Sequence, residues 1–316
     1  MFQLVLSQIG PFTVSGLVVG AIYALLAFGY SLVYRVLHLI NFAHAEVFML
    51  GTLGALATTQ ALGIAPFNAH AMSTGGVVLV LVACLAAAII VSVIVSTALE
   101  LCVYRPIRKR GGSGFAALIA SLGCSLFLQE LVAHFDGRDL LPFPVLVPKT
   151  PLLSIGDFMI RADQVLVFVL ALLIAGGLHL FMMRSRFGRS IRAVSIDLQA
   201  ATLIGVNSSL VVLLTFVLAG ASAGAAAFLY LTLYGSTSYL AGFAIGIKAF
   251  TAAVLGGMGS VSGALLGGLL IGLLENYGAM VTGSQWEGVY AFIGLLIVLL
   301  FRPRGILGER AIRARM

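Results

Sequence analysis

The chain has 316 residues, of which 61% are hydrophobic and only 9% carry a charge. Soluble globular domains carry about 25% charged residues, so this composition excludes an ordinary soluble protein and predicts a polytopic membrane protein. The formal net charge of +7 does not indicate nucleic-acid binding, because the basic residues cluster between apolar runs, where they set membrane topology.

Apolar runs of the length that spans a bilayer as a helix, about 20 residues, recur along the whole chain. Short connections join them, so we expect a single transmembrane domain over residues 1–316. The expected fold is all-α, with about eight transmembrane helices and a range of roughly seven to nine. The runs before residue 231 cover approximately residues 10–34, 37–59, 76–99, 115–134, 164–183 and 209–230.

The next apolar region, residues 243–280, is interrupted by LGGMGSVSG at residues 255–263. Its front half is short for a full crossing, so the pattern predicts a broken or re-entrant helix, followed by a last span near residues 288–301. No lysine follows these glycines, so they do not form a phosphate-binding P-loop. Irregular backbone at membrane depth must be covered by protein or line a water-filled cavity.

Clusters of arginine and lysine predict which loops face the cytoplasm. They occupy residues 105–110, 184–192 and 302–315, which places the C-terminus in the cytoplasm. The loop at about residues 135–163 has three basic residues, four acidic residues and four prolines, so we expect it outside as an irregular segment. The N-terminus lies outside if both early segments cross the membrane, and inside if one of them is re-entrant.

Glu46, Lys248 and Glu275 interrupt apolar runs. Charged groups at membrane depth usually face a bundle interior or an aqueous cavity, although a position near the interface would allow snorkelling. Asn41 and His44 accompany Glu46, and His44 by itself is most simply a packed histidine without metal-ligand spacing. Candidates for the translocation path or a helix interface are Asn41, His44, Glu46, Lys248, Gly256, Gly257, Gly259, Ser260 and Glu275.

The segment at about residues 184–207 is too polar to span a membrane. Ile191, Val194, Leu198 and Ala201 recur at helical spacing, which predicts one short amphipathic helix between two spans. Such a helix can lie on the membrane or dock into a partner's groove, and both interpretations remain open on these residues.

Glycine pairs spaced four apart open two of the apolar regions, as Gly16-x-x-x-Gly20 and Gly242-x-x-x-Gly246. They indicate either an internal repeat, which many transporters contain, or simply sites where helices pack closely. The sequence contains no nucleophile elbow, zincin motif or nucleotide-binding motif. We therefore expect no enzyme activity, no catalytic residue, no cofactor and no metal site in this chain.

Several motifs together resemble the LivH-like permeases, one of two membrane subunits of the branched-chain amino acid ABC importers. The first is INFAHAE at residues 40–46, followed by MLG at 49–51. Ala45 departs from this motif, in which the family usually has glycine. The other matches are GIKAFTAAVLGGMGSVSGALLGGLLIGLLE at 246–275, YRPIR at 104–108, FRPRGILG at 301–308 and the G-x-x-x-R-A…D…A-x-x-x-G-[IV]-N pattern within 186–207.

This resemblance implies a permease subunit in a bacterial inner membrane, forming the path for branched-chain or related amino acids delivered by a periplasmic binding protein. Its expected partners are membrane lipid, a second homologous permease subunit and two cytoplasmic ATPase subunits that bind ATP and magnesium. We expect a heterodimer of permeases, although the residues leave a homodimer open. The segment at 184–207 becomes a coupling helix, with candidate residues Arg186, Gly188, Arg189, Arg192, Asp197 and Gly205. Its apolar stripe is expected to seat in an ATPase groove.

Two alternatives remain open. The first alternative is an importer of the same class that carries urea or short amides, because relatives with that cargo share the same motifs. A stand-alone secondary transporter that uses Glu46 and Lys248 as an ion relay is the other.

Overall fold

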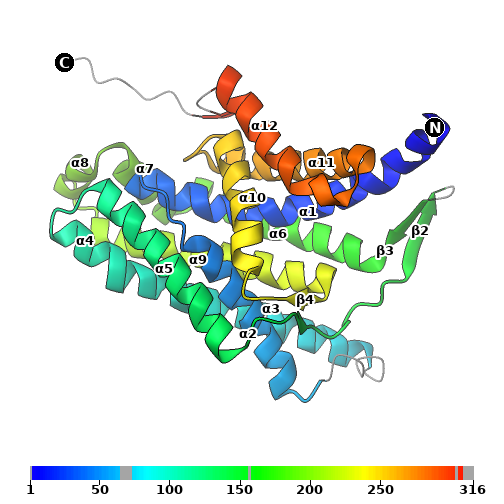
Figure 1. Cartoon of the computed structure of the whole chain (residues 1–316). Helices are drawn as coiled ribbons and strands as arrows, with labels where there is room; N and C mark the ends of the chain where they lie inside the picture. The colour runs from blue at the N-terminus through cyan, green and yellow to red at the C-terminus, as the bar shows by residue number, and fades with distance from the viewer. Residues whose placement is uncertain (1, 65–72, 156–157, 303–304, 309–316) are drawn as a thin grey trace.

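The computed structural model describes residues 2–64, 73–155, 158–302 and 305–308. This part of the chain is a helical bundle with two small antiparallel sheets at its edges (Figure 1). Seven of its helices are long and apolar enough to cross a membrane. The predicted all-α polytopic fold is therefore confirmed.

The seven spans lie in long helices that alternate with shorter elements. The long helices are α1 (Phe2–Leu37), α3 (Thr74–Leu99), α5 (Gly114–Phe135), α6 (Ala162–Arg184), α9 (Ser208–Tyr234), α11 (Val261–Thr282) and α12 (Glu287–Phe301). The shorter helices are α2 (His44–Ala61), α4 (Arg105–Lys109), α7 (Arg186–Ile196), α8 (Leu198–Leu203) and α10 (Ala241–Gly256). A π-helical turn, Glu100–Tyr104, joins α3 to α4, and a 3₁₀ turn, Ser284–Trp286, precedes α12. Strand β1 (Leu141–Pro142) pairs with β4 (Ser236–Thr237), and β2 (Pro151–Ile155) pairs with β3 (Phe158–Arg161).

Helix α1 forms the centre of the bundle. Its most apolar window is 94% buried, and it packs against α6, α9, α10 and α11. Gly16 and Gly20 face Gly268 and Gly272 of α11, and a Cβ added at Gly20 would lie 2.9 Å from the Gly268 carbonyl oxygen. Small residues on both helices thus bring the two backbones together, which is how transmembrane helices gain van der Waals contact. The spacing at residues 16 and 20 serves close packing.

The second expected span differs from the observed helix. Helix α1 continues to Leu37, the chain then turns through His38, whose φ is 53°, and α2 begins only at His44. Most residues along α2 are buried, because α3, α9 and α10 surround it. The prediction that a helix starts near Leu37 is therefore wrong. Protein encloses the first turns of α2, so His44 and Glu46 do not face lipid.

The predicted helix break is confirmed. Helix α10 ends at Gly256 and α11 begins at Val261. Gly257 and Gly259 between them have φ values of 112° and 86°, a region of backbone conformation that glycine adopts readily and other residues avoid. The Ser260 hydroxyl accepts the Gly263 N–H at 3.1 Å and caps α11.

A C-terminal segment closes the end of α10. The backbone N–H groups of Ile306 and Leu307 donate to the carbonyls of Leu255 and Gly256, each at 2.9 Å. Carbonyls in the last turn of a helix have no partner within the helix, so these two bonds satisfy groups that the break exposes. The break is thus built from two segments about 50 residues apart in the chain.

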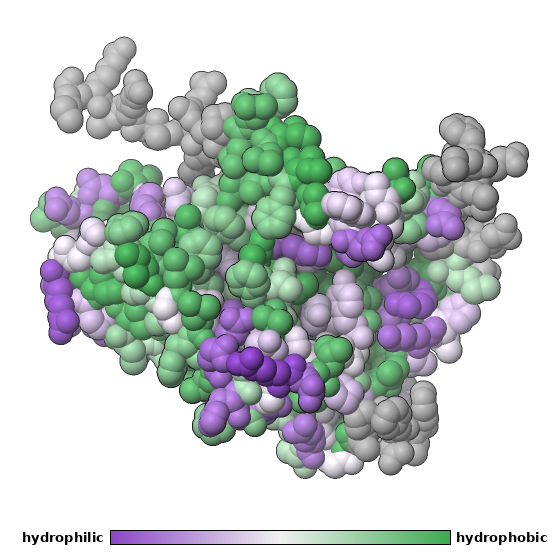
Figure 2. All heavy atoms as spheres, in the orientation of Figure 1, coloured by the Kyte–Doolittle hydropathy of each residue, from purple (hydrophilic) through white to green (hydrophobic). Residues whose placement is uncertain are grey.

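The helical segments that carry the arginine and lysine clusters and the β2–β3 hairpin lie at opposite ends of the bundle. Helices α4, α7 and α8 gather at one end, while β2, β3 and the start of α1 lie at the other (Figure 1). Hydrophobic side chains cover the visible faces of α5 and α12, whereas hydrophilic side chains lie in patches at the α4–α8 end, at the lower centre of the view and toward the hairpin end (Figure 2). Among the described residues before 73, α1 is the one helix long and apolar enough to cross a membrane, so a second early crossing stays a prediction. Arg304, Arg310, Arg313 and Arg315 of the expected cytoplasmic tail lie outside the described residues.

Candidate functional site

The Glu46 carboxylate is fully buried in the first turn of α2. Ser125 of α5 donates a hydrogen bond to its Oε1 at 3.2 Å, and its Oε2 has no hydrogen-bond partner among the described residues. A Cβ added at Gly242 of α10 would lie 2.6 Å from Oε2. Glu46 therefore lies between three helices of its own chain, α2, α5 and α10, and its place near a helix N-terminus favours the negative charge.

Asn41 and His44 lie just before Glu46 in the chain, and both are buried. Tyr104 donates its hydroxyl hydrogen to Asn41 Oδ1 at 2.6 Å. The His44 ring is fully buried and meets the ring of Tyr30 edge-on, with 4.8 Å between centroids. A Cβ at Gly29 would overlap the His44 ring, so the imidazole fills a space that a glycine leaves open. The structure places His44 as a packed aromatic group.

Ala45, which departs from the family motif, faces Gly246 of α10. A Cβ added at Gly246 would overlap the Ala45 methyl group. The glycines at positions 242 and 246 thus form the surface on which α2 crosses α10. As with the pair in α1, these glycines provide close packing.

The polar stripe of α5 was not anticipated from the sequence. Ser121, Ser125 and Gln129 recur every four residues on the buried side of α5. Ser121 Oγ accepts the Phe42 N–H at 3.3 Å, and Ser125 contacts Glu46. Their spacing in an otherwise apolar span was the signal that could have identified them, because side chains four apart share one helix face.

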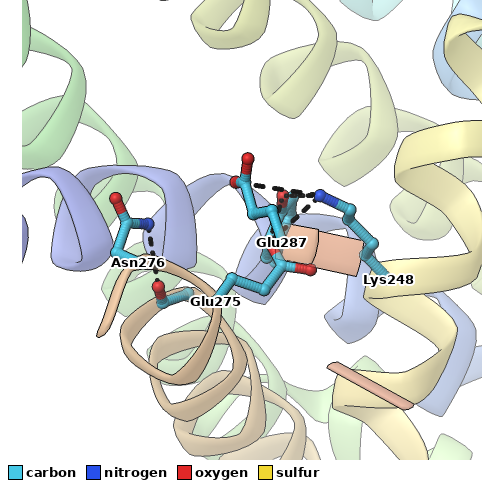
Figure 3. A network of polar contacts seen from close by, with 6 residues as sticks. Lys248, Glu275, Asn276 and Glu287 are labelled. Atoms are coloured by element: carbon cyan, nitrogen blue, oxygen red, sulfur yellow. Dashed lines mark hydrogen bonds and ion pairs between the residues drawn. The ribbon is translucent and has the colours of Figure 1, made fainter. Parts of the chain in front are cut away.

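A second buried polar cluster, the Lys248 cluster, consists of Lys248, Glu275, Tyr23 and Glu287. Lys248 Nζ donates to Glu275 Oε2 at 3.1 Å and lies 3.9 Å from Glu287 Oε1. Tyr23 donates to the same Glu275 oxygen at 2.9 Å. Figure 3 shows Lys248 extending from α10 toward the carboxylates of α11 and α12. The cluster joins α1, α10, α11 and α12, and the fully buried Glu275 is an ion-pair partner and does not snorkel to the interface.

The glycine-rich break lies apart from this ion pair. Gly256 meets the backbone of Gly263, and Arg35 at the end of α1 donates Nη1 to the Gly259 carbonyl at 3.2 Å. Gly256, Gly257, Gly259 and Ser260 therefore shape the α10–α11 connection. Of the predicted path candidates, the structure pairs Lys248 with Glu275 and groups Asn41, His44 and Glu46 separately.

The segment at residues 184–207 forms two helices where one was predicted. Asp197 breaks it, because its Oδ1 accepts the backbone N–H groups of Gln199 and Ala200 at 2.8 and 2.9 Å and caps α8. Ile191 and Val194 are buried within this chain, so these stripe residues are not free to seat in a partner's groove. The prediction of one continuous helix is therefore wrong, and of the stripe predicted to seat in an ATPase groove only Leu198 is exposed.

Other residues of this segment hold it to α6 or face outward. Arg192 Nη1 donates to the Met182 carbonyl at 2.6 Å, and Gly188 packs against the same backbone so closely that a Cβ would overlap it. Gly205, with φ of 89°, ends the segment, whereas Arg186 and Arg189 are exposed. The exposed apolar side chains near Asp197, where α7 ends and α8 begins, are Ile196, Leu198, Leu203 and Ile204.

Comparisons with known proteins cover nearly the whole chain. The family model described as "Branched-chain amino acid transport system / permease component" matches residues 12–301. The chain is 44% identical to the high-affinity branched-chain amino acid transport system permease protein BraD of Pseudomonas aeruginosa, over 94% of each chain. It is 35% identical to the corresponding protein LivH of Escherichia coli K12, over 93% of this chain and 94% of the relative.

The fold is also similar to a solved structure. A chain in the structure of PsaBC from Streptococcus pneumoniae in complex with Fab aligns with a TM-score of 0.50 at 13% identity, over 99% of this chain and 98% of that one. At this level of identity the likeness concerns the fold alone.

Proposed function

The chain belongs to the family of branched-chain amino acid transport system permease components, and from this membership we propose that it forms the translocation path of an ATP-driven importer of branched-chain or related amino acids. The observation that carries this proposal is the 44% identity to BraD over 94% of both chains. The family match over residues 12–301 reaches every helix of this chain from α1 to α12.

The proposed assembly contains a second, homologous permease subunit, two ATPase subunits and a binding protein that delivers the amino acid. ATP and magnesium are bound by the ATPase subunits. We place the chain in the inner membrane, with the end formed by α4, α7 and α8 and the C-terminus in the cytoplasm, because the arginine and lysine clusters of the sequence fall in these segments. The apolar faces of α5 and α12 would contact lipid or the second permease.

ATPase coupling is assigned to α7 and α8. Their outward surface combines the cations Arg186 and Arg189 with exposed apolar side chains such as Ile196 and Leu203. Arg192 and Gly188 connect the same segment to the end of α6, so a push on α7 would be transmitted to a membrane-spanning helix. The coupling surface therefore lies around the Asp197 break, beside the buried stripe of Ile191 and Val194.

A stand-alone ion-coupled transporter is the alternative from another class. It would need Glu46 and Lys248 to exchange ions along one route. Glu46 contacts Ser125 and lies against Gly242, whereas Lys248 is paired with Glu275. Each charge thus has its own local environment, which favours structural roles for both.

The decisive experiment is uptake by proteoliposomes that contain the chain with its cognate permease, ATPase and binding protein. We expect uptake of labelled leucine, isoleucine or valine that requires ATP and stops when the ATPase subunits are omitted. Competition with excess urea and with short amides tests the related cargo. Uptake by this chain alone, driven by an ion gradient without ATP, would overturn the importer proposal. Uptake of urea without uptake of amino acids would overturn the proposal that the substrate is an amino acid.

A further inference from the structure

A cleft opens at the end of the bundle that carries the β2–β3 hairpin. Its volume is about 390 Å³, within the roughly 300–1,000 Å³ typical of small-molecule sites. Residues of α1, α6, α9, α11 and α12 line it, together with the segment that leads into the hairpin. Strand β3, which contributes Arg161 to the lining, lies at the opposite end of the bundle from α7 and α8 (Figure 1), and that is the end where a delivered substrate would arrive.

Two cations enter the cleft from the hairpin side. Lys149 is exposed and forms no hydrogen bond or ion pair with a described residue. Arg161 donates Nε and Nη2 to the two carboxylate oxygens of Asp163, at 3.1 and 3.0 Å. Asp163 is fully buried and thus holds the guanidinium in one orientation, which leaves Nη1 of Arg161 available to a ligand.

The α11–α12 side of the cleft supplies acceptors. The Glu287 side chain is 33% exposed and lies 3.9 Å from Lys248 Nζ, at the outer edge of the Lys248 cluster. Asn276 donates Nδ2 to the Gly272 carbonyl at 2.9 Å, so its amide is fixed and its Oδ1 remains an acceptor (Figure 3). Between the charged sides, Val18 and Leu233 add apolar surface.

We propose that this cleft is a binding subsite for a free amino acid in its zwitterionic form. The α-carboxylate lies toward Lys149 and Arg161, and the α-ammonium group lies toward Glu287 and Asn276. An aliphatic side chain packs against Val18 and Leu233. A simple anion would meet the Glu287 carboxylate and a simple cation would meet Lys149, so the lining favours a ligand with both charges. The inference rests on the proposed function, because it names where that substrate binds in this chain.

The test measures binding of labelled L-leucine to the assembled permease–ATPase complex in nanodiscs, without the binding protein. We expect saturable binding to the wild type, and an affinity about tenfold weaker for Lys149→Gln and for Glu287→Gln, since each variant removes a charge-assisted hydrogen bond. Lys149→Arg keeps the cation and should restore binding. Arg138→Gln and Glu130→Gln are the matched controls, because this ion pair lies outside the cleft lining with side chains 67% and 63% exposed, and they should bind like the wild type.

Ligand analogues identify which charge each residue recognises. Leucinol lacks the carboxylate, so the Lys149→Gln variant should bind leucinol as tightly as the wild type does. 4-Methylpentanoate keeps the carboxylate and lacks the ammonium group, so the affinity of the same variant for this ligand should fall. Equal leucine affinity in the cleft and control variants would overturn the subsite. Normal ATP-driven uptake by a wild-type complex that binds no leucine would overturn the subsite alone and leave the importer proposal standing. Absence of ATP-driven amino-acid uptake would instead overturn the importer proposal.

Discussion

Replacement of Lys248 by methionine removes the cation from a buried ion pair and keeps most of the side-chain volume. Glu275 is fully buried, and the Lys248 side chain is only 19% exposed. After the substitution, the Glu275 carboxylate retains the hydrogen bond from Tyr23 but has lost its cation. We expect the connection between α10 and α11 to be strongly destabilised.

The magnitude follows from the 3.1 Å separation between Lys248 Nζ and Glu275 Oε2. At an effective dielectric constant of about 20, Coulomb attraction at that distance is about 5 kcal/mol. Removal of one partner from a buried pair destabilises proteins by about 3–5 kcal/mol, because the other charge stays buried without compensation. Taking about 2 °C per kcal/mol for a large domain, the apparent Tm of Lys248→Met should fall by roughly 6–10 °C.

A double-mutant cycle separates the ion pair from general damage. The double variant Lys248→Met/Glu275→Gln removes both charges and keeps an acceptor for Tyr23, so it should be more stable than Lys248→Met alone. Thermal unfolding of the purified assembled complex provides the measurement. Arg138→Met is the control, since an exposed ion pair contributes about 0–1 kcal/mol. Strictly additive effects of the two single substitutions would refute the reasoning, because they would mean that Lys248 and Glu275 do not interact.

Three further predictions concern backbone contacts. Gly268→Ala should lower the apparent Tm, because its methyl group would overlap the backbone of α1. Gly177 has open space around it, so Gly177→Ala should leave the Tm unchanged or raise it, since alanine in place of glycine stabilises a helix by up to about 1 kcal/mol. Gly257→Leu should reduce ATP-driven uptake at least about tenfold, since its φ of 112° strains any other residue, and wild-type uptake would contradict this role for the break. Arg192→Glu should lower both the Tm and ATPase recovery on affinity purification, because it loses its hydrogen bonds to the α6 carbonyls. Arg186 is exposed and serves as the control, so Arg186→Glu should lower ATPase recovery alone; equal Tm values would exclude the structural role of Arg192.

Much of the membrane topology could be predicted from the chain itself. Apolar runs of spanning length identified seven helices that the structure contains, and the glycines at 255–263 identified the break between α10 and α11. Both features are encoded locally, since hydropathy over about 20 residues determines whether a helix can span a bilayer. Clustered arginines likewise marked the end at which α4, α7 and α8 lie.

The errors arose where distant segments meet. The stripe of Ile191 and Val194 was read as a surface for a partner, but the bundle of this chain buries both residues. Asp197 was predicted to lie within one continuous helix, but α7 ends just before it and its side chain caps α8. Periodicity identifies an apolar face and does not identify what covers that face.

The sequence alone determined the class of protein, the positions of its spans, the location of the break and the family, because each of these depends on neighbouring residues along the chain. Only the tertiary structure decided which groups neutralise the buried charges. Glu46 meets Ser125 from α5, and Lys248 meets Glu275 across the break. The physical reason is that a charge in a low-dielectric interior requires a partner within a few ångströms, and packing of the helices determines which side chain lies at that distance.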